Sequence, residues 1–316
     1  MIRAFLSFLF LSLIFIAGCP PKQDIRQAPN EIPQGLLPIA TIEGEVLGQK
    51  LSGPIGIEAD DFGDLYLVDA GNSRLVKFDR EFKAVRDVGG FGRSDGLLNS
   101  PTYLGIDNNL NLYIADAGNQ RVSVYDSRLN FAEEISLIDD TDPLRFGRPS
   151  GIIVNRYGEL WVADYDKAQI LIFNNVHQFS RVIGGRENSI GLLLNPEGMA
   201  VSPPDRILVC DAGNGVIKVF DNIGVHQFTF GGDYLEYPTG VDVDRFGNIW
   251  VCDRDLNKVF CFNRSGDYLY SIGEEGRDGV YGMESPSDLT VAWGDKLIIS
   301  DKGNNRLLVY DILFPE

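Results

Sequence analysis

Beyond about residue 36, apolar residues come in short runs separated by glycine, asparagine and aspartate. In the first unit the runs cover residues 54–59, 65–68, 75–78 and 84–88. No stretch in this part of the chain has apolar residues at the 3.6-residue spacing of an amphipathic helix. Short apolar runs between turn residues predict β-strands joined by tight turns, here four strands to a unit.

The unit repeats six times along the chain. A proline precedes an aspartate by 15 residues in every repeat, and the prolines are Pro54, Pro101, Pro149, Pro196, Pro238 and Pro286. The matching aspartates are Asp69, Asp116, Asp164, Asp211, Asp253 and Asp301. Successive prolines are 47, 48, 47, 42 and 48 residues apart. Repeats of 40 to 50 residues that each hold four short strands are typical of a β-propeller. The pattern therefore predicts an all-β, six-bladed propeller.

The last repeat lacks a fourth strand, because only five residues follow Asp311. Residues 36–44 resemble the fourth strand of another repeat, residues 268–273. We therefore expect this N-terminal strand to complete the last blade and to cover an edge that would otherwise be open to aggregation.

The repeated text resembles NHL repeats. It combines Pro-x-Gly, a strand of the Leu-Tyr-Val-Ala-Asp type and the run Gly-Asn-x-Arg-x-x-x-Phe/Tyr-Asp. The resemblance covers about residues 37–316 and implies a six-bladed NHL-type propeller. Three repeats depart from Gly-Asn-x-Arg, at residues 166–169, at Val216 and at residues 255–258. The resemblance specifies fold more than function, since propellers host binding modules, scaffolds, lyases and hydrolases.

The N-terminus has the features of an export signal. Arg3 precedes an uncharged apolar run at residues 4–17, which is too short to cross a bilayer as a helix. The sequence Ile-Ala-Gly-Cys that ends at Cys19 resembles the lipobox of bacterial lipoproteins. This resemblance implies a signal peptide over residues 1–18, a lipid on Cys19 and a flexible tether over residues 19–36. The alternatives are an ordinary signal peptide and a buried helix.

We therefore expect an extracytoplasmic lipoprotein that contacts the membrane through its lipid anchor alone. Pro20 stands after the lipid cysteine, with no aspartate there. This resembles lipoproteins that are sent to an outer membrane, which predicts the outer membrane or the cell surface in a host that has one.

Net charge narrows the range of partners. The 316 residues include 28 Lys and Arg against 45 Asp and Glu, for a net charge of −17. A nucleic-acid surface needs clustered cations, so this balance argues against one. The 44% of apolar residues is ample for a propeller core.

Positions that change from blade to blade carry more functional information than the repeated aspartates, which we interpret as caps of the following turns. Alternation along the first strand predicts that the second and fourth residues after each proline lie near the central channel. The polar and aromatic side chains at these positions are Glu58, Tyr103, Asp242 and Asp288, with Glu197 at the mouth. Such a lining is compatible with a cation such as Ca²⁺ held by Glu58, Asp242 and Asp288, with a cationic or polar ligand, or with water alone.

The loops that join the blades add exposed candidates, which we expect on the same face as the channel residues. They are Phe91, Arg93, Arg186, Tyr234, Arg277 and Tyr281. Aromatic residues mixed with arginine are typical of recognition surfaces.

The histidines and the other cysteines fit structural positions. His177 and His226 follow the third strands of their blades, which places them in outer hairpins and leaves no histidine cluster for zinc. Cys210, Cys252 and Cys261 fit small buried positions, and a disulfide between Cys252 and Cys261 stays open.

The sequence thus favours a lipid-anchored binding or scaffold module that presents a loop face to a protein, peptide or glycan of the cell envelope. No cofactor is expected for such a module. The alternative is a hydrolase or lyase that depends on a divalent cation, with Ca²⁺ held by the channel carboxylates. The two hypotheses differ in geometry, because carboxylates that hold Ca²⁺ converge within about 2.3–2.6 Å of one point.

Overall fold

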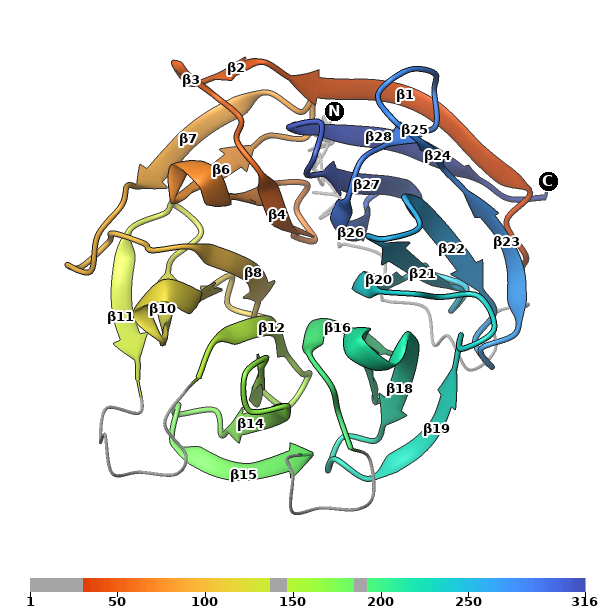
Figure 1. Cartoon of the computed structure of the whole chain (residues 1–316). Coiled ribbons are helices and arrows are strands. Elements are labelled where there is room, and N and C mark those ends of the chain that lie inside the picture. Colours follow the sequence, from red (N-terminus) through yellow and green to blue (C-terminus); the bar gives the residue numbers. More distant parts are fainter. Residues whose placement is uncertain (1–30, 137–146, 185–191, 316) are drawn as a thin grey trace, which may run out of the picture.

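The computed structural model describes residues 31–136, 147–184 and 192–315. These residues form six four-stranded antiparallel sheets arranged around a central axis (Figure 1). The predicted six-bladed β-propeller is confirmed. In the described part of the chain, no helix is long and apolar enough to cross a membrane.

The blades follow one another in chain order, and in blades 1 to 5 the strands run in sequence from the innermost to the outermost. Blade 1 consists of β4 (Pro54–Ala59), β5 (Leu65–Asp69), β6 (Arg74–Phe78) and β7 (Ala84–Gly89). Blade 2 consists of β8 (Pro101–Ile106), β9 (Leu112–Asp116), β10 (Arg121–Tyr125) and β11 (Phe131–Ile135). Blade 3 consists of β12 (Pro149–Val154), β13 (Leu160–Asp164), β14 (Gln169–Phe173) and β15 (Phe179–Gly184).

The second half of the ring has the same plan. Blade 4 consists of β16 (Pro196–Ser202), β17 (Arg206–Asp211), β18 (Val216–Phe220) and β19 (His226–Phe230). Blade 5 consists of β20 (Pro238–Val243), β21 (Ile249–Asp253), β22 (Lys258–Phe262) and β23 (Tyr268–Ile272). Blade 6 consists of β26 (Pro286–Ala292), β27 (Lys296–Asp301), β28 (Arg306–Leu313) and, on its outer edge, β1 (Gly35–Glu43).

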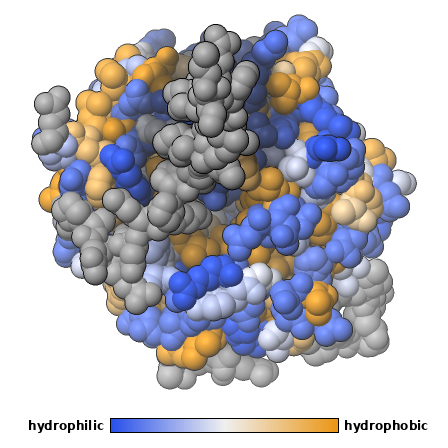
Figure 2. Space-filling view, turned by 180° about the vertical axis from the view of Figure 1, so that it is seen from behind, coloured by the Kyte–Doolittle hydropathy of each residue, from blue (hydrophilic) through white to orange (hydrophobic). Residues whose placement is uncertain are grey.

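Several short elements lie outside the six sheets, on one face of the ring. They are β2 (Glu45–Val46), β3 (Gln49–Lys50), β24 (Glu274–Glu275), β25 (Gly282–Met283) and the 3-10 turns η1 (Ala70–Asn72), η2 (Ala117–Asn119) and η3 (Ala212–Asn214). We call this the upper face; the loops between blades lie on it, and each first strand starts there at its proline (Figure 1). The lower face carries the turns between first and second and between third and fourth strands. Figure 2 shows the molecule from this side.

The lower-face turns are built by aspartate and asparagine. In blade 1, one oxygen of Asp60 accepts the backbone N–H groups of Phe62 and Asp64, both at 2.9 Å. The equivalent turns of blades 2, 3 and 5 begin with Asp107, Asn155 and Asp244 and make the same pair of bonds. A side-chain oxygen that replaces a backbone acceptor in this way stabilises a tight turn, as the sequence punctuation indicated.

The N-terminal strand closes the ring as predicted. β1 pairs antiparallel with β28, from Gly35 opposite Leu313 to Glu43 opposite Arg306. Leu36 packs into the core between blades 5 and 6. The first and last described segments of the chain therefore share one sheet, and the outer edge of β28 is paired.

The repeated aspartates hold the upper face together, although only part of the expected turn capping is found. One oxygen of Asp69 accepts the backbone N–H of Ser52 at 2.8 Å, in the loop before the first strand. The other accepts Asn72 Nδ2 and Arg74 Nε, both at 2.8 Å. In every blade the aspartate accepts a backbone N–H from this preceding loop. Backbone N–H groups of the turn that follows also bind the aspartate in blades 3 and 5, whereas in blades 1, 2, 4 and 6 that turn contributes an asparagine side chain.

The repeats that lack Gly-Asn-x-Arg replace its bonds by other means. In blade 4, Lys218 Nζ lies 2.8 Å from Asp211 and takes the place of the arginine. In blade 5, Asp253 accepts the backbone N–H groups of Asp255 and Leu256 in the following turn. The buried carboxylate therefore keeps its partners in these blades, which explains how the turn sequence can vary.

The hydrophobic core lies between the blades. Each of six clusters of buried side chains joins two neighbouring blades, and the cluster of blades 2 and 3 contains Tyr113, Val122, Val162 and Phe173. Because every blade contributes to two clusters, the hydrophobic contacts form a closed ring, which holds the first strands rigidly around the axis.

Candidate functional site

The first strands of neighbouring blades touch one another around the axis. An ideal Cβ at Gly151 would lie 1.9 Å from the backbone oxygen of Glu197, and one at Gly198 would lie 2.4 Å from that of Thr239. The glycines at the second position after proline therefore face the next blade. The expectation that this position lines the channel is wrong where it is glycine, because the absence of a side chain is what lets the strands meet.

A ring of hydroxyl groups joins the first strands. The residues after the prolines donate to the carbonyl oxygen of the next blade's proline at 2.6–3.3 Å, and the donors are Thr102, Ser150, Thr239 and Ser287. Ile55 and Glu197 occupy the other two positions. The carboxyl group of Glu197 thus stands where a hydroxyl elsewhere links two blades.

Tyr103 spans the channel. Its hydroxyl, carried by blade 2, donates to the backbone oxygen of Thr239 on blade 5 at 2.9 Å and lies 3.3 Å from that of Ser287 on blade 6. The side chain is buried, and burial raises the pKa of its phenol well above the ordinary value. Tyr103 therefore separates an upper mouth from a lower mouth.

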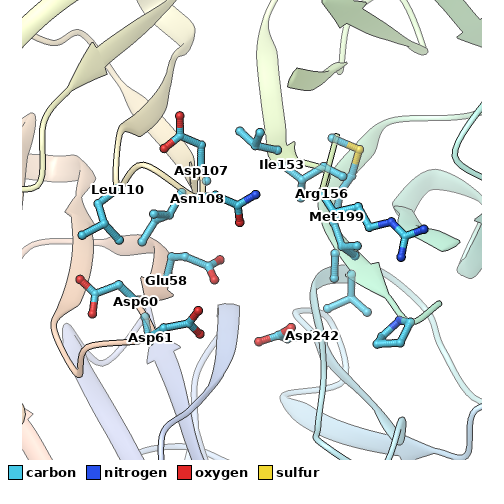
Figure 3. Close-up of a pocket in the computed structure, with 18 of the residues that line it drawn as sticks. Glu58, Asp60, Asp61, Asp107, Asn108, Leu110, Ile153, Arg156, Met199 and Asp242 are labelled. Carbon is cyan, nitrogen blue, oxygen red and sulfur yellow. The ribbon is translucent and has the colours of Figure 1, made fainter. Parts of the chain in front are cut away.

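A cavity of about 620 Å³ opens at the lower mouth (Figure 3). First strands and lower-face turns of blades 1 to 5 line it, with Glu58, Asp61, Phe62, Asp107, Asn108, Leu110, Ile153, Arg156, Met199 and Asp242 among its residues. We call it the acidic cavity. Arg156 is the one cationic side chain among the described residues of this lining; its Nε lies 2.5 Å from Asp205, and its guanidinium points away from the middle (Figure 3).

Backbone amides hold the carboxyl group of Asp242 in place. It accepts the N–H groups of Val291 and Val243, both at 2.7 Å. Burial raises its pKa to about 6, against the lowering effect of these bonds. Deeper in the channel, Asp288 accepts the N–H of Ile57 at 3.0 Å, and burial raises its pKa well above the ordinary value. Both aspartates tie neighbouring first strands together.

Glu58 differs from these two aspartates. Its carboxyl group points into the cavity from blade 1, toward Asp242 on blade 5 (Figure 3). Among the described residues, no donor lies within hydrogen-bonding distance of it. Enclosure by protein raises its pKa well above the ordinary value, and the charges of Asp242 and Asp288 raise it further. A carboxylate in this place lacks the counter-charge that would stabilise it.

The three channel carboxylates do not form a coordination sphere. In residues 31–136, 147–184 and 192–315, no group of three or more His, Cys, Asp or Glu side chains is placed to hold a metal ion. Backbone N–H groups already use part of the acceptor capacity of the Asp242 and Asp288 carboxylates. The geometry thus lacks the convergence that the Ca²⁺ hypothesis requires.

The upper mouth carries a cluster that the sequence analysis missed. Tyr165 and Tyr237 meet with their hydroxyl oxygens 2.9 Å apart. Arg148 lies 4.2 Å from the ring centroid of Tyr165, and Arg254 lies 3.8 Å from that of Tyr237. These residues stand directly before the repeated proline or directly after the repeated aspartate. The blade-by-blade comparison that selected Glu58 would have found them if it had included these two positions.

The loop residues selected from the sequence divide into structural and exposed ones. Arg93 donates to the backbone oxygen of Asn119, and Arg277 donates to that of Asn304, both at 2.8 Å. Tyr281 donates to the backbone oxygen of Leu36 on β1 at 3.0 Å. These three side chains therefore hold loops and the closing strand in place.

Two further loop residues are exposed, but they do not share a site. Phe91 is 78% exposed on the upper face, whereas Tyr234 stacks on Tyr268, with ring centroids 4.3 Å apart, at the outer edge of blades 4 and 5. Arg186 and Cys19 lie outside the described residues.

The expectation that loops and channel carboxylates share one face is wrong. The loops and Glu197 lie toward the upper face, while Glu58 and Asp242 open on the lower face. The reason is topological: Glu58 stands near the lower end of β4, just before the turn into β5, whereas the loops enter each blade at the proline.

The histidines and cysteines occupy structural positions. His177 Nε2 lies 3.0 Å from the Tyr113 hydroxyl in an outer turn, and His226 Nε2 lies 2.8 Å from Thr229 Oγ1 on an outer strand. Cys210, Cys252 and Cys261 are buried and free. Cys252 faces Val259 across the ladder and not Cys261, so the two thiols are not partners.

Comparison with known proteins relates segments of the chain to NHL-repeat proteins. No family model matches the sequence. Protein brain tumor of Drosophila melanogaster is 30% identical over 131 residues, which are 41% of this chain and 13% of that protein. NHL-repeat-containing protein 4 of Mus musculus is 32% identical over 81 residues, which are 25% of this chain and 54% of that protein. The chain therefore spans about half or less of the length of these relatives.

Solved structures share the fold at low sequence identity. Virginiamycin B lyase from Staphylococcus aureus is 15% identical with a TM-score of 0.61, over 86% of this chain and 88% of that one. A gluconolactonase from Xanthomonas campestris is 16% identical with a TM-score of 0.62, over 90% and 99%. Such identities show the propeller fold alone. The chain is thus a six-bladed β-propeller with segments similar to NHL-repeat proteins.

Proposed function

We propose that the protein is a membrane-tethered binding module whose acidic cavity receives a cationic group, an ammonium or guanidinium, from its ligand. The observation that carries this proposal is Glu58, an enclosed carboxyl group that points into a cavity of about 620 Å³ with no donor bound to it among the described residues. Ligand sites in proteins are concave and direct a small number of polar groups at the ligand, as this cavity does.

The chemistry of the cavity selects for positive charge. Glu58 and Asp242 face each other, and the nearest cation in the lining is already paired with Asp205. A ligand cation between the two carboxyl groups would favour the ionised form of both and replace repulsion by attraction. Phe62, 75% exposed at the entrance, offers an aromatic surface for the alkyl stem of a lysine or arginine.

The tether would hold this cavity near a membrane. Asn248 on the lower face donates to the backbone oxygen of Glu31 at 2.9 Å, so the described chain begins on that face. Glu31 lies 12 residues after Cys19, so the chain between them reaches at most about 40 Å when fully extended. With a lipid on Cys19, the acidic cavity would face the bilayer surface outside the cytoplasm, and the partner would be a protein, peptide or glycan of the cell envelope.

A second function, that of a hydrolase or lyase that depends on a divalent cation, has less support. The names of two proteins of similar fold, a lyase and a gluconolactonase, suggest it. However, the oxygens of Asp242 and Asp288 are engaged by backbone N–H groups, and no third ligand joins them in the described part of the chain. Binding without a chemical step fits these bonds better.

Calorimetric titration with tri-lysine and tri-arginine, and with tri-glutamine as the neutral control, tests the proposal. We expect at least one cationic peptide to bind, more weakly at higher salt. Glu58→Gln should reduce its affinity tenfold or more. Glu81→Gln, which removes a carboxylate from an exposed outer turn of the same blade, is the matched control and should change little. Equal affinity in Glu58→Gln and wild type, or no binding of either cationic peptide, contradicts the proposal.

A further inference from the structure

The upper mouth of the channel is built differently from the rest of the upper face. Tyr165 of blade 3 and Tyr237 of blade 5 reach toward each other across blade 4, and their hydroxyl oxygens lie 2.9 Å apart. Burial raises the pKa of the Tyr237 phenol, and its bond to Tyr165 raises it further, so this hydroxyl keeps its proton at neutral pH. One of the two hydroxyl protons forms the bond between the oxygens. The proton of the other hydroxyl is then available to an acceptor on a ligand.

Each tyrosine ring is covered by a guanidinium group. Arg148 precedes the proline of blade 3 and lies over Tyr165, and Arg254 follows the aspartate of blade 5 and lies over Tyr237. In blade 3 the arginine precedes the proline and the tyrosine follows the aspartate, and in blade 5 the two residue types are exchanged. A guanidinium stacked on a ring has a fixed plane and still presents its N–H edge, which matches the geometry of a carboxylate.

The present partners of the arginines are exchangeable. Arg148 lies 3.1 Å from Asp166, with both side chains 52% exposed, and Arg254 lies 2.9 Å from Asp255, with 36% and 43% exposed. Ion pairs in such exposed positions contribute little to stability. A ligand carboxylate can therefore replace either aspartate at small cost.

Cationic side chains gather at the upper mouth although the whole chain is acidic. Glu197 is the carboxyl group at this mouth. The positive charges of Arg148, Arg254 and Lys302 all lower its pKa. Burial nevertheless raises the pKa of Glu197 to about 7, so near neutral pH it is in part uncharged. With Asp166 and Asp255 paired to two of these three cations, the upper mouth carries charges of both signs, in contrast to the carboxylates at the lower mouth.

The propeller scaffold does not require these side chains. After the repeated aspartate, blades 1, 2 and 4 have alanine, and before the proline they have Gly53, Ser100 and Asn195. These blades form the same four-stranded sheets, although their upper turns are 3-10 turns, which blades 3 and 5 lack. The sheets of blades 3 and 5 therefore do not depend on these arginine and tyrosine side chains.

We propose that the upper mouth is a second binding site, which takes an acidic peptide segment through Arg148, Arg254 and the Tyr165–Tyr237 pair. Two guanidinium groups on opposite sides of the tyrosine pair call for two carboxylates on one ligand, which a run of aspartate or glutamate supplies. The site shares no residue with the acidic cavity, and Tyr103 stands between the two. This inference is independent of the function proposed for the lower mouth.

Titration of the full domain with hexa-glutamate tests the site. We expect binding that weakens with salt. The double variant Arg148→Gln/Arg254→Gln should lose at least tenfold in affinity. The double variant Arg80→Gln/Arg128→Gln removes the same charge from exposed lower-face turns and should bind like wild type. Tri-lysine binding at the acidic cavity should not decrease in Arg148→Gln/Arg254→Gln, so a failure of the upper site is distinguishable from a failure of the proposed function.

A conservative variant guards against misfolding. Arg148→Lys keeps the charge but not the planar fork, and we expect a threefold or greater loss of hexa-glutamate affinity with an unchanged melting temperature. Absence of hexa-glutamate binding to wild type, or equal loss in both double variants, would overturn the proposal. Binding of tri-galacturonate without binding of hexa-glutamate would also overturn it, in favour of an acidic glycan.

Discussion

The hydroxyl of Tyr103 on blade 2 donates a hydrogen bond to the backbone oxygen of Thr239 on blade 5, 2.9 Å away on the other side of the channel. The other blades have glycine or aspartate at the Tyr103 position, so this one side chain fills the middle of the axis. The contact stabilises the ring across its diameter, and it divides the channel into two mouths of different chemistry.

Removal of this hydroxyl should measure the cross-channel contact. Tyr103→Phe keeps the ring but leaves the carbonyl of Thr239 without its donor in a buried place, and we expect the free energy of unfolding to fall by about 1–2 kcal/mol. Urea unfolding monitored by circular dichroism gives this value. Tyr234→Phe removes a hydroxyl from an exposed ring and should change it by less than about 0.5 kcal/mol. Equal effects of the two variants would mean that the cross-channel bond contributes nothing.

The closing strand offers a second test, because neighbouring residues on β1 face opposite sides. Leu36 is 6% exposed and packs against blades 5 and 6, whereas Leu37 is 50% exposed. We expect Leu36→Ala to lower the free energy of unfolding by about 2–3 kcal/mol through the lost burial and the cavity. Leu37→Ala should lower it by less than about 0.5 kcal/mol. Similar values for both variants would show that β1 contributes through backbone pairing alone.

The fold could be predicted because the same pattern of strands and turns occurs in every repeat. Pro54 and Asp69 mark the ends of one hairpin, and five further pairs at the same spacing repeat that information. The pairing of β1 with β28 was also predictable, because a propeller repeat without its fourth strand leaves an open edge.

The site was predictable only in part. Comparison of equivalent positions selected Glu58, Tyr103, Asp242 and Asp288, with Glu197 at the mouth. Glu58 and Asp242 line the acidic cavity, and Tyr103 crosses the channel. Which mouth each residue faces depends on how far along its strand it lies. The Tyr165–Tyr237 pair joins blades 3 and 5, and a contact between side chains 72 residues apart leaves no local pattern in the sequence.

Close contact at the axis leads to a third prediction. An added methyl group at Gly198 would stand 2.4 Å from the backbone oxygen of Thr239, and backbone on both sides cannot move without opening the ring. We expect Gly198→Ala to lower the free energy of unfolding by about 3 kcal/mol or to prevent folding. Gly35→Ala is the control, because nothing lies within 4 Å of the added atom. A Gly198→Ala protein with the wild-type melting temperature would contradict the packing described for the first strands.

The carboxyl groups in the channel predict an unusual dependence of stability on pH. Burial raises the pKa of Glu197 to about 7 and that of Asp242 to about 6, above the value of about 4 expected in the unfolded chain. Between these values the folded protein binds more protons than the unfolded chain. The free energy of unfolding must therefore fall as the pH rises through this window, the reverse of the behaviour of a salt-bridged aspartate.

Urea unfolding at pH 5, 6, 7 and 8 measures this slope, and two variants assign it. Glu197→Gln cannot ionise, so the part of the decline that belongs to Glu197 should disappear and the curve should become flatter between pH 5 and pH 7. Glu81→Gln, on an exposed outer turn, should keep the wild-type slope. If wild type and Glu197→Gln give parallel curves, Glu197 ionises in the folded protein as it does in water, and the upper mouth holds a full negative charge beside its arginines.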